Sequence, residues 1–490
     1  MSRFTIATLA LALLAGGFLR FAGLGGREMS ADEGASWAAA SAPTIRAVLH
    51  AQHSLNPGKA GLHDVALHLW MRVLGERLAV MRALSAAVGT LAILLVFGAA
   101  RELFWASGEA DDGKRPGAHR RNEAAAIAAL VFAVNLVTIK YSREVRMYSF
   151  VIAAVVAQTW CFFRAMRCGG LAVYAGVAIF TAIAIAAHLT AVLAFAAEGL
   201  WLAFVIARNR FDFATVHGRR ALALMIALGA GATMLAPIAP AMLGEAAHAA
   251  NSGAIDWIER PQPWAPFSMF NKATGSIAFP LMMALAAWGV VRGWRRWRDA
   301  ITFTLLWMWL PPIVLMIASY AIRPVFVERY LISCFVPFFI LITIGIVELP
   351  WPSARFGAIV LVAAVAIGHV VSWDRKSHDA QWSEAVRLAV ASITSTTSST
   401  SGNLGNPANY KITPASRATL AVAPGYAVDV VRFYLPNPTA QLAHPADLIR
   451  HDPASVVIIG DQSAPQTTAA LDREYPRLLA NLRGVMVRGR

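Results

Sequence analysis

Residues 79–100 read AVMRALSAAVGTLAILLVFGAA, an apolar run with a single charged side chain, Arg82. A helix of about 17 to 25 apolar residues is long enough to cross the roughly 30 Å hydrocarbon core of a bilayer. Runs of this kind recur from residue 4 to about residue 373 and then stop. The sequence therefore predicts an all-α, polytopic membrane protein that is followed by a segment of different character.

The composition agrees with this class. Of the 490 residues, 57% are hydrophobic and only 14% are charged, whereas soluble domains have roughly 25% charged residues. The net charge of +15 comes largely from Arg and Lys in short loops between apolar runs, as membrane topology requires. We therefore expect membrane lipids, and not nucleic acid, as partners. The three cysteines have no metal-ligand spacing and no disulfide pattern.

About eleven transmembrane helices are predicted. They lie near residues 4–24, 79–100, 123–139, 149–166, 171–187, 190–207, 221–243, 276–291, 301–321, 330–347 and 355–373. Arginines gather in alternate loops, such as those at Arg120 and Arg296, which places these loops in the cytoplasm. The N-terminus is then inside, and the loop 25–78, the His188 turn and everything after Trp373 lie outside.

Two domains are expected, a transmembrane domain at 1–373 with the outer loop 25–78, and a second domain at 374–490. The outer loop is typical of short amphipathic helices that lie along the membrane interface. The second domain begins with a Ser/Thr/Gly/Asn-rich stretch and then alternates strand-like and helical patterns. The strand-like runs are 419–423, 456–459 and 485–487, and the helical stretch is 469–482. This pattern predicts a small α/β domain outside the membrane.

An acid pair, Asp32 and Glu33, follows the first span within the run SADEGASW at residues 30–37. One interpretation is a capping box with Ser30 as N-cap and Glu33 at N3, both acids being favoured by the helix dipole. The other is catalytic, with Asp32 as a general base and Glu33 orienting it or binding a cation. Neighbours on a helix point about 100° apart, so the two acids should not share one role.

A polar cluster occupies residues 140–149, KYSREVRMYS, in an outer loop and at the start of the next helix. If this segment is helical, Arg143 and Arg146 share a face, as do Glu144 and Tyr148. Two guanidinium groups side by side suit a phosphate or a diphosphate. The alternative is an interfacial belt of aromatic and snorkelling side chains.

Other candidates are fewer and weaker. Arg323 is one, together with Glu328, Arg329 and Tyr330, which open the tenth span. One arginine here could hold a lipid phosphate, or Glu328 and Arg329 could pair or anchor the helix. His188 and the pair His63 and Asp64 could bind substrate or metal, although a histidine at a membrane edge is more often only hydrogen-bonded. Walker A loops, Rossmann glycine patterns, nucleophile elbows and HExxH motifs are lacking.

Four stretches resemble the GT-C glycosyltransferases of the protein mannosyltransferase and aminoarabinose transferase type. They are LRFAGLGGREMSADEGASW, LHLWMRVLGERLAVMRALSAAVGTLAILLVFGAARELF, YSREVRMYSF and ERYLISCFVPF. The resemblance covers about residues 4–373, and its most specific parts are the acid pair and the Tyr-Ser-x-Glu-x-Arg-Met-Tyr segment that begins at Tyr141. One departure is residues 59–63, KAGLH, where many relatives have a His-Pro-Pro-Leu-Tyr-like stretch.

The resemblance implies a site that faces the periplasm of a bacterial inner membrane and a polyprenyl-phosphate sugar donor. Asp32 would be the catalytic base, with Glu33 beside it. The residues expected to contact substrate are Tyr141, Arg143, Glu144, Arg146, Tyr148 and Arg329, with His63 and His188 as further candidates. A divalent metal ion is a candidate cofactor whose ligands the sequence does not identify.

The sequence thus predicts a hexosyl or pentosyl transferase that acts on a lipid, glycan or protein acceptor. An alternative is a transporter or flippase of lipid-linked sugars, although transporters commonly place ionisable residues at mid-membrane. A structural subunit with a partner-binding tail is a third possibility.

Overall fold

The computed structural model describes two compact units. The first comprises Met1–Leu24 and Thr44–Asp374, and the second Gly25–Pro43 and Arg375–Arg490, so the predicted outer loop 25–78 is divided after residue 43. The described residues are 1–55, 58–106, 117–208, 210, 212–251, 258–275 and 278–375, with the short segments 382–383, 386–387, 419–423, 428–435, 442–443, 456–461 and 485–487.

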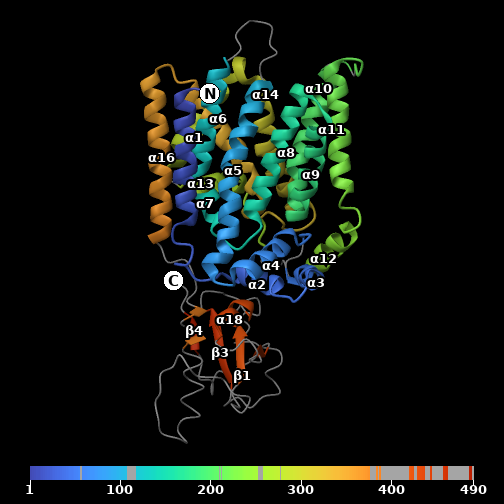
Figure 1. The fold of residues 1–490 in the computed structure, drawn as a ribbon, viewed down its shortest axis with the longest axis vertical. Coiled ribbons are helices and arrows are strands. Elements are labelled where there is room, and N and C mark those ends of the chain that lie inside the picture. Colours follow the sequence, from blue (N-terminus) through green and yellow to red (C-terminus); the bar gives the residue numbers. More distant parts are fainter. Residues whose placement is uncertain are drawn as a thin grey trace, which may run out of the picture. The chain divides into compact units, whose positions relative to one another are not determined.

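The first unit is a bundle of long apolar helices (Figure 1). They are α1 (Arg3–Phe21), α5 (Leu78–Ala106), α6 (Ala118–Val134), α7 (Leu136–Ser142), α8 (Tyr148–Cys168), α9 (Leu171–Ala187), α10 (Val192–Arg208), α11 (Val216–Thr233), α14 (Ala278–Ala321), α15 (Phe335–Val347) and α16 (Pro352–Arg375). Shorter helices connect them: α3 (Ile45–Leu55), α4 (Leu62–Leu74), α12 (Ala239–Asn251), α13 (Ala265–Thr274) and the 3-10 helices η1 (Leu189–Ala191) and η2 (Glu328–Cys334).

The prediction of an all-α polytopic fold is confirmed. Within the described residues, seven helices are long and apolar enough to span a membrane. α6 and α7, which meet at an angle of 60°, make an eighth if the pair is counted as one span. α14 has 44 residues with a non-helical Trp297 inside, and its length of about 66 Å is twice the hydrocarbon thickness. It therefore holds both spans predicted at 276–291 and 301–321. α9 and α11 have 17 and 18 residues, which is also within the range of a span.

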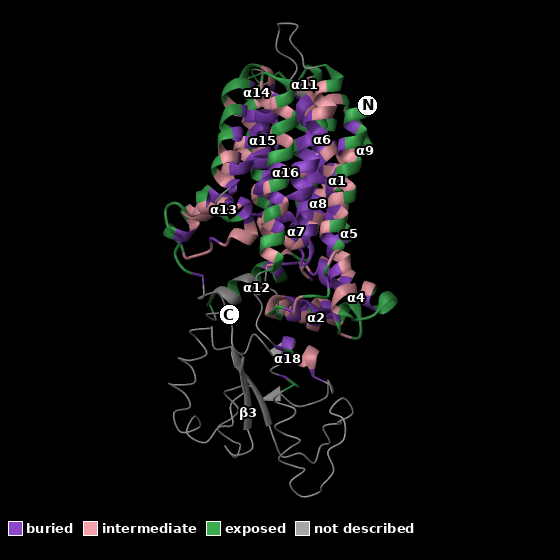
Figure 2. Cartoon of the chain, turned by 90° about the vertical axis from the view of Figure 1, so that its left-hand side faces the viewer, coloured by how far each residue is buried: buried purple, intermediate pink, exposed green. Residues whose placement is uncertain are grey.

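Burial divides the bundle into a centre and a lipid-facing rim. Every residue of α15 is buried, and its run of Phe, Ile and Leu packs against α14 and α6. α16 buries only three residues, Val362, Ala366 and Val370, and shows a largely exposed face in Figure 2. A helix that is apolar all round but exposed is typical of a lipid-facing position.

The contact between α14 and α15 requires glycine. A Cβ on Gly289 would lie 2.6 Å from the backbone N of Gly345, and one on Gly345 would run into the carbonyl of Leu285. Small residues allow helix backbones to approach closely in membranes, where packing replaces the hydrophobic effect. These two glycines therefore set the separation of the two helices.

We expect Gly345→Ala to lower the melting temperature of the purified protein in detergent, because overpacking costs about 1–3 kcal/mol. Gly368→Ala is the matched control, since a Cβ there has open space around it and alanine has the higher helix propensity. A Gly345→Ala melting temperature equal to that of the control would contradict the close approach.

Ion pairs join the helices at the end of the bundle where α1 and α6 begin, called here the basic end. Glu102 accepts hydrogen bonds from Arg167 at 2.6 and 2.8 Å and from Arg164 at 3.3 Å. Glu348 binds Arg120 and Arg296. Since these arginines belong to loops that the sequence assigns to the cytoplasm, carboxylates at helix ends partly neutralise the basic loops.

The second unit contains a parallel sheet of four strands in the order β2-β1-β3-β4. The strands are β1 (Thr419–Ala423), β2 (Leu442–Ala443), β3 (Val456–Asp461) and β4 (Val485–Val487). The three strand-like runs of the sequence thus coincide with β1, β3 and β4. The helix predicted at 469–482 lies outside the described residues. The unit also holds α2 (Ala31–Ala40) and α18 (Val428–Tyr434).

Candidate functional site

The acid pair opens α2, and the two acids have different environments. Ser30 is the N-cap and accepts a hydrogen bond from Glu33 N at 3.3 Å, while Ser30 N donates to Glu33 Oε2 at 2.9 Å. The capping box expected from the sequence is therefore present. Glu33 is buried by this role, with 1% of its surface exposed, whereas Asp32 is half-buried. Of the two, Asp32 is the acid that is not part of the cap.

α2 packs against α18 within the second unit. Trp37 meets Phe433 edge to face with ring centroids 5.3 Å apart, and Met29 N donates to the Tyr434 hydroxyl at 2.8 Å. Gly34 faces Val430 so closely that a Cβ would lie 2.8 Å from the Val430 N. The helix that carries Asp32 is thus held by residues from the C-terminal part of the chain.

The segment between α7 and α8 is a turn, so the expected pairing of Arg143 and Arg146 on one helical face is wrong. α7 ends at Ser142 and α8 begins at Tyr148. Arg143 donates to Asp374 Oδ1 at 2.6 Å and to the Leu19 carbonyl at 2.7 Å. The backbone carbonyl of Arg146 accepts a hydrogen bond from Ser85 Oγ at 3.2 Å, and its guanidinium acts on His63 and His188. The two arginines therefore have different partners.

Arg146 belongs to a cluster at the end of the bundle where α3 and α4 lie, called here the site end. Two backbone hydrogen bonds build it: Ala60 N donates to the Ala186 carbonyl at 3.0 Å, and Leu189 N to the Gly58 carbonyl at 3.1 Å. They hold Lys59 beside His188, and Gln52 Nε2 donates to the Lys59 carbonyl at 2.7 Å. Lys59 is 3% exposed. An ammonium group is thereby buried at the site end.

His188 connects this segment to η2. Its Nδ1 accepts a hydrogen bond from Thr190 N at 3.3 Å, and Thr190 Oγ1 donates to the Tyr330 carbonyl at 2.9 Å. The rings of His188 and Tyr330 lie 4.9 Å apart. Burial, together with the positive charges of Lys59, Arg146 and Arg329, lowers the pKa of His188 to about 3. His188 is therefore neutral at physiological pH, and three cations act on it.

His63 and Asp64 at the start of α4 form a buried dyad with Nδ1 and Oδ1 3.1 Å apart. Burial alone would raise the pKa of Asp64, but Lys59, the hydrogen bond from His63 and Arg146 outweigh it and lower the pKa. Burial lowers the pKa of His63. The neutral imidazole then donates from Nδ1 to the carboxylate. Its Nε2 has no hydrogen-bond partner among the described residues and can accept a hydrogen bond from a ligand.

The remaining candidates surround Arg146 and Arg329. Tyr141 and Tyr148 meet edge to face at 4.8 Å, and the guanidinium of Arg146 lies 5.9 Å from the ring centroid of Tyr148. Glu144 and Arg329 both act electrostatically on Tyr141. Glu328 pairs with Lys272 at 2.6 Å. Arg329 acts electrostatically on both Tyr141 and His188.

We expect the melting temperature to fall between pH 7 and pH 5, and the fall to be shallower in His188→Asn. The pKa of His188 is lower in the folded protein than the ordinary value near 6.5, so its full stabilisation exists above pH 6.5 and is lost as the pH falls. The loss is at most about 1.4 kcal/mol per pH unit. His119→Asn, at an exposed position, is the control. A His188→Asn profile as steep as that of the control would refute the buried neutral imidazole.

The divalent metal ion considered from the sequence stays a prediction. Within the described ranges, no group of three or more His, Cys, Asp or Glu side chains is arranged to hold a metal ion. Lys59 and Arg146 act electrostatically on His63 and Asp64. Lys59, Arg146 and Arg329 act on His188.

The structure brings together seven of the predicted site residues, namely His63, Tyr141, Glu144, Arg146, Tyr148, His188 and Arg329. It adds Lys59 to them, which the sequence contained only within the stretch that departs from the family pattern. Asp32 and Glu33 belong to the second unit, and Arg143 is bound to Asp374. The sequence feature that could have identified Lys59 is its position, because a cation in an outer loop runs against the positive-inside trend.

Solved structures share this fold. ArnT from Cupriavidus metallidurans, bound to undecaprenyl phosphate, has a TM-score of 0.54 at 14% identity and covers 98% of this chain and 89% of its own. Its apo form has a TM-score of 0.54 at 13% identity and covers 96% and 88%.

The Archaeoglobus fulgidus oligosaccharyltransferase, in complex with Zn and sulfate, has a TM-score of 0.54 at 13% identity and covers 90% of this chain. The alignment spans 62% of that enzyme's length. Neither a protein-family model nor a curated protein sequence matches this chain. By its architecture, the chain shares the fold of these solved membrane-protein structures.

Proposed function

We propose that the chain is a glycosyltransferase that moves a sugar from a polyprenyl-phosphate donor to a hydroxyl or amine of a lipid, glycan or protein acceptor. The single observation that carries the proposal is the convergence of Lys59, Arg146 and Arg329 around His188. These cations come from three distant parts of the chain. The GT-C fold and the solved complex of ArnT with undecaprenyl phosphate support the same donor class.

The chemistry assigned to this cluster is stabilisation of the leaving group. In a single displacement, the acceptor oxygen or nitrogen bonds to the anomeric carbon while the bond from that carbon to the phosphate oxygen breaks. The electron pair leaves with the phosphate, whose negative charge grows. Preorganised cations in a dry site stabilise such charge more than water does. Inversion at the anomeric carbon follows from the single displacement.

Asp32 is proposed as the base that takes the proton of the acceptor. The assignment rests on the resemblance of its segment to the GT-C family and on the environment of the two acids. Glu33 is occupied by the cap, whereas Asp32 is half-buried. Tyr141, Glu144 and Tyr148 are proposed to contact the donor, and His63 Nε2 to accept a hydrogen bond from it.

The proposed location is a bacterial inner membrane, with the basic end in the cytoplasm and the site end facing the periplasm. Arg120, Arg164, Arg167 and Arg296 lie at the basic end, as the positive-inside rule requires of cytoplasmic loops. A donor used on the other side must arrive already activated, which a lipid phosphate does. The hexosyl or pentosyl nature of the sugar is part of the proposal.

The test is binding of undecaprenyl phosphate to purified protein, measured by native mass spectrometry. We expect Lys59→Gln to weaken binding by about tenfold or more, since a charge-assisted contact contributes about 1.5–3 kcal/mol. Arg72→Gln, at an exposed position of α4, is the matched control and should bind as the parent does. Equal binding by the two variants would show that the phosphate lies elsewhere.

A transporter of lipid-linked sugars is the competing function. It would also need cations near the interface, but net movement of donor lipid across a vesicle membrane without transfer of the sugar would identify it. We expect transfer, and no counter-transport, because the described cations of the site lie at helix ends and in turns and not on broken helices at mid-membrane.

A further inference from the structure

A cavity of about 240 Å³ lies at the basic end, opposite the site. It is lined by residues from the N-terminal parts of α1, α6 and α16 and from the end of α15. Two of them are arginines, Arg120 and Arg355, and one is an acid, Glu123. Pockets for drug-sized ligands have volumes of about 300–1,000 Å³, so this cavity suits a smaller polar head group.

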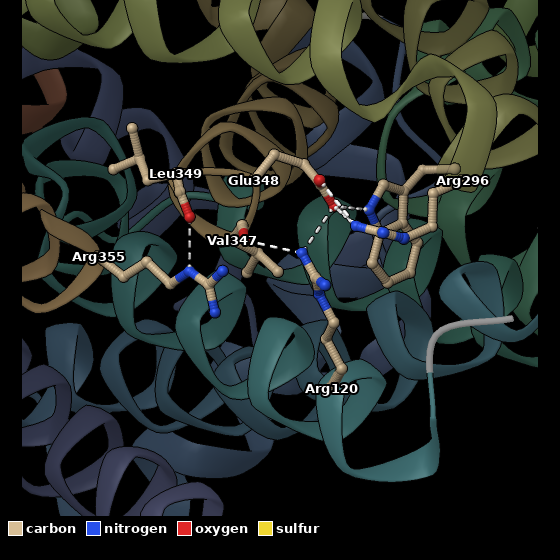
Figure 3. A network of polar contacts seen from close by, with 7 residues as sticks. Arg120, Arg296, Val347, Glu348, Leu349 and Arg355 are labelled. Carbon is tan, nitrogen blue, oxygen red and sulfur yellow. Dashed lines mark hydrogen bonds and ion pairs between the residues drawn. The ribbon is translucent and has the colours of Figure 1, made fainter. Parts of the chain in front are cut away.

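Arg120 interacts with two acids, Glu348 and Glu123, and it shares Glu348 with a second arginine. Glu348 accepts hydrogen bonds from Arg296 at 2.9 and 2.8 Å, from Trp297 Nε1 at 2.8 Å and from Arg120 at 3.0 Å (Figure 3). One carboxylate thus serves two guanidinium groups. Arg120 also donates to the Val347 carbonyl at 2.9 Å, and its buried Nε has no hydrogen-bond partner within the described part of the chain.

Arg355 adds a second cation beside Arg120. Its Nε donates to the Leu349 carbonyl at 2.8 Å, and its other two guanidinium nitrogens make no hydrogen bond to the described residues (Figure 3). Arg120 and Arg355 repel each other electrostatically. Both stand in the first turn of a helix, α6 or α16, where the helix dipole adds positive potential. An anion between the two guanidinium groups would relieve the repulsion.

The rest of the lining has two further properties. Glu123 accepts a hydrogen bond from Ser2 Oγ at 3.3 Å, and as the acid of the lining it can accept another from a ligand. Phe4 on α1 and Phe356 and Ile359 on α16 form an apolar wall. Phe4 and Phe356 are exposed, so the wall continues onto the lipid-facing surface of the bundle.

We propose that this cavity binds the head group of a membrane glycerophospholipid, with the phosphate between Arg120 and Arg355 and a donor group of the head group on Glu123. The acyl chains then lie against Phe4, Phe356 and Ile359. Phosphate and two guanidinium groups match in charge and geometry, and the carboxylate selects head groups that carry an N–H or O–H. Phosphatidylethanolamine has both parts, whereas phosphatidylcholine has the same phosphate but no N–H donor.

The experiment is native mass spectrometry of the full chain in detergent with one added lipid at a time. We expect phosphatidylethanolamine to be retained about tenfold more than phosphatidylcholine, and Arg355→Gln to lower retention of both lipids by about tenfold. Glu123→Gln should remove the preference and leave phosphatidylcholine retention unchanged. Arg101→Gln, an exposed arginine outside the cavity, is the matched control.

Two further measurements complete the test. Ile359→Trp fills the cavity without changing its charge, so it should also lower lipid retention. It provides an independent test if Arg355→Gln does not fold. Excess inorganic phosphate should not displace the lipid, because the apolar wall contributes to lipid binding. Displacement would show that the cavity binds free anions and not lipid. Equal retention of the two lipids by the parent, or retention in Ile359→Trp equal to that in Arg101→Gln, would overturn the proposal.

Discussion

Asp32→Asn should abolish transfer of sugar from a polyprenyl-phosphate donor while the protein remains inserted in the membrane. The change keeps size and polarity but removes the carboxylate that is proposed to take the acceptor's proton. General base catalysis contributes about 10²–10⁴ to the rate, so turnover should fall by at least about 100-fold. The assay is transfer from labelled donor lipid in proteoliposomes.

Glu33→Gln is the control for Asp32. Its amide oxygen can still accept the hydrogen bond from Ser30 N, which Glu33 accepts at 2.9 Å, so the cap and most activity should remain. If Asp32→Asn retained full turnover, Asp32 would be eliminated as the base. If Glu33→Gln alone lost turnover, the base would be reassigned to Glu33.

Asp64→Ala should cause the largest loss of stability at the site end. Asp64 is fully buried, and Lys59 and Arg146 act on it. Removing one member of a buried charge group leaves the other charges uncompensated, which costs about 3–5 kcal/mol. We therefore expect little folded protein, measured as the yield of monodisperse material in detergent and its melting temperature.

A double variant separates charge from packing. Lys59→Met with Asp64→Asn removes one cation and one anion together, so its stability should exceed that of Asp64→Ala although it changes two residues. The double variant should still fail to bind polyprenyl phosphate, because Lys59 is absent. Stability of the double variant below that of Asp64→Ala would show that Asp64 acts through its shape and hydrogen bond, and not through charge compensation.

Local patterns predicted most of the fold. The apolar run 171–187 is α9, and the capping box at Ser30 and Glu33 begins α2. β1 and β4 match the predicted runs 419–423 and 485–487. These features depend on residues within a few positions of each other, where periodicity, capping and chain length act directly.

Sequence patterns predicted the site less well, because its contacts join residues that are far apart in the chain. Arg143 appeared suited to pair with Arg146, but its partner is Asp374, 231 residues away. Lys59 lies beside His188 because backbone hydrogen bonds join the residues next to them. A side-chain pattern in the sequence does not reveal such bonds. The break at Asn135, which separates α6 from α7, has a local cause within an otherwise apolar run, because Asn135 Oδ1 caps α7 by accepting a hydrogen bond from Val137 N at 3.1 Å.

The most direct test is a cryo-electron microscopy structure of the protein in nanodiscs with undecaprenyl phosphate. We expect density for the phosphate within about 4 Å of the Lys59 ammonium and the guanidinium groups of Arg146 and Arg329, a distance at which ion pairs form. Phosphate density at the basic end, with none beside Lys59, would contradict the assignment of the cation cluster to the donor.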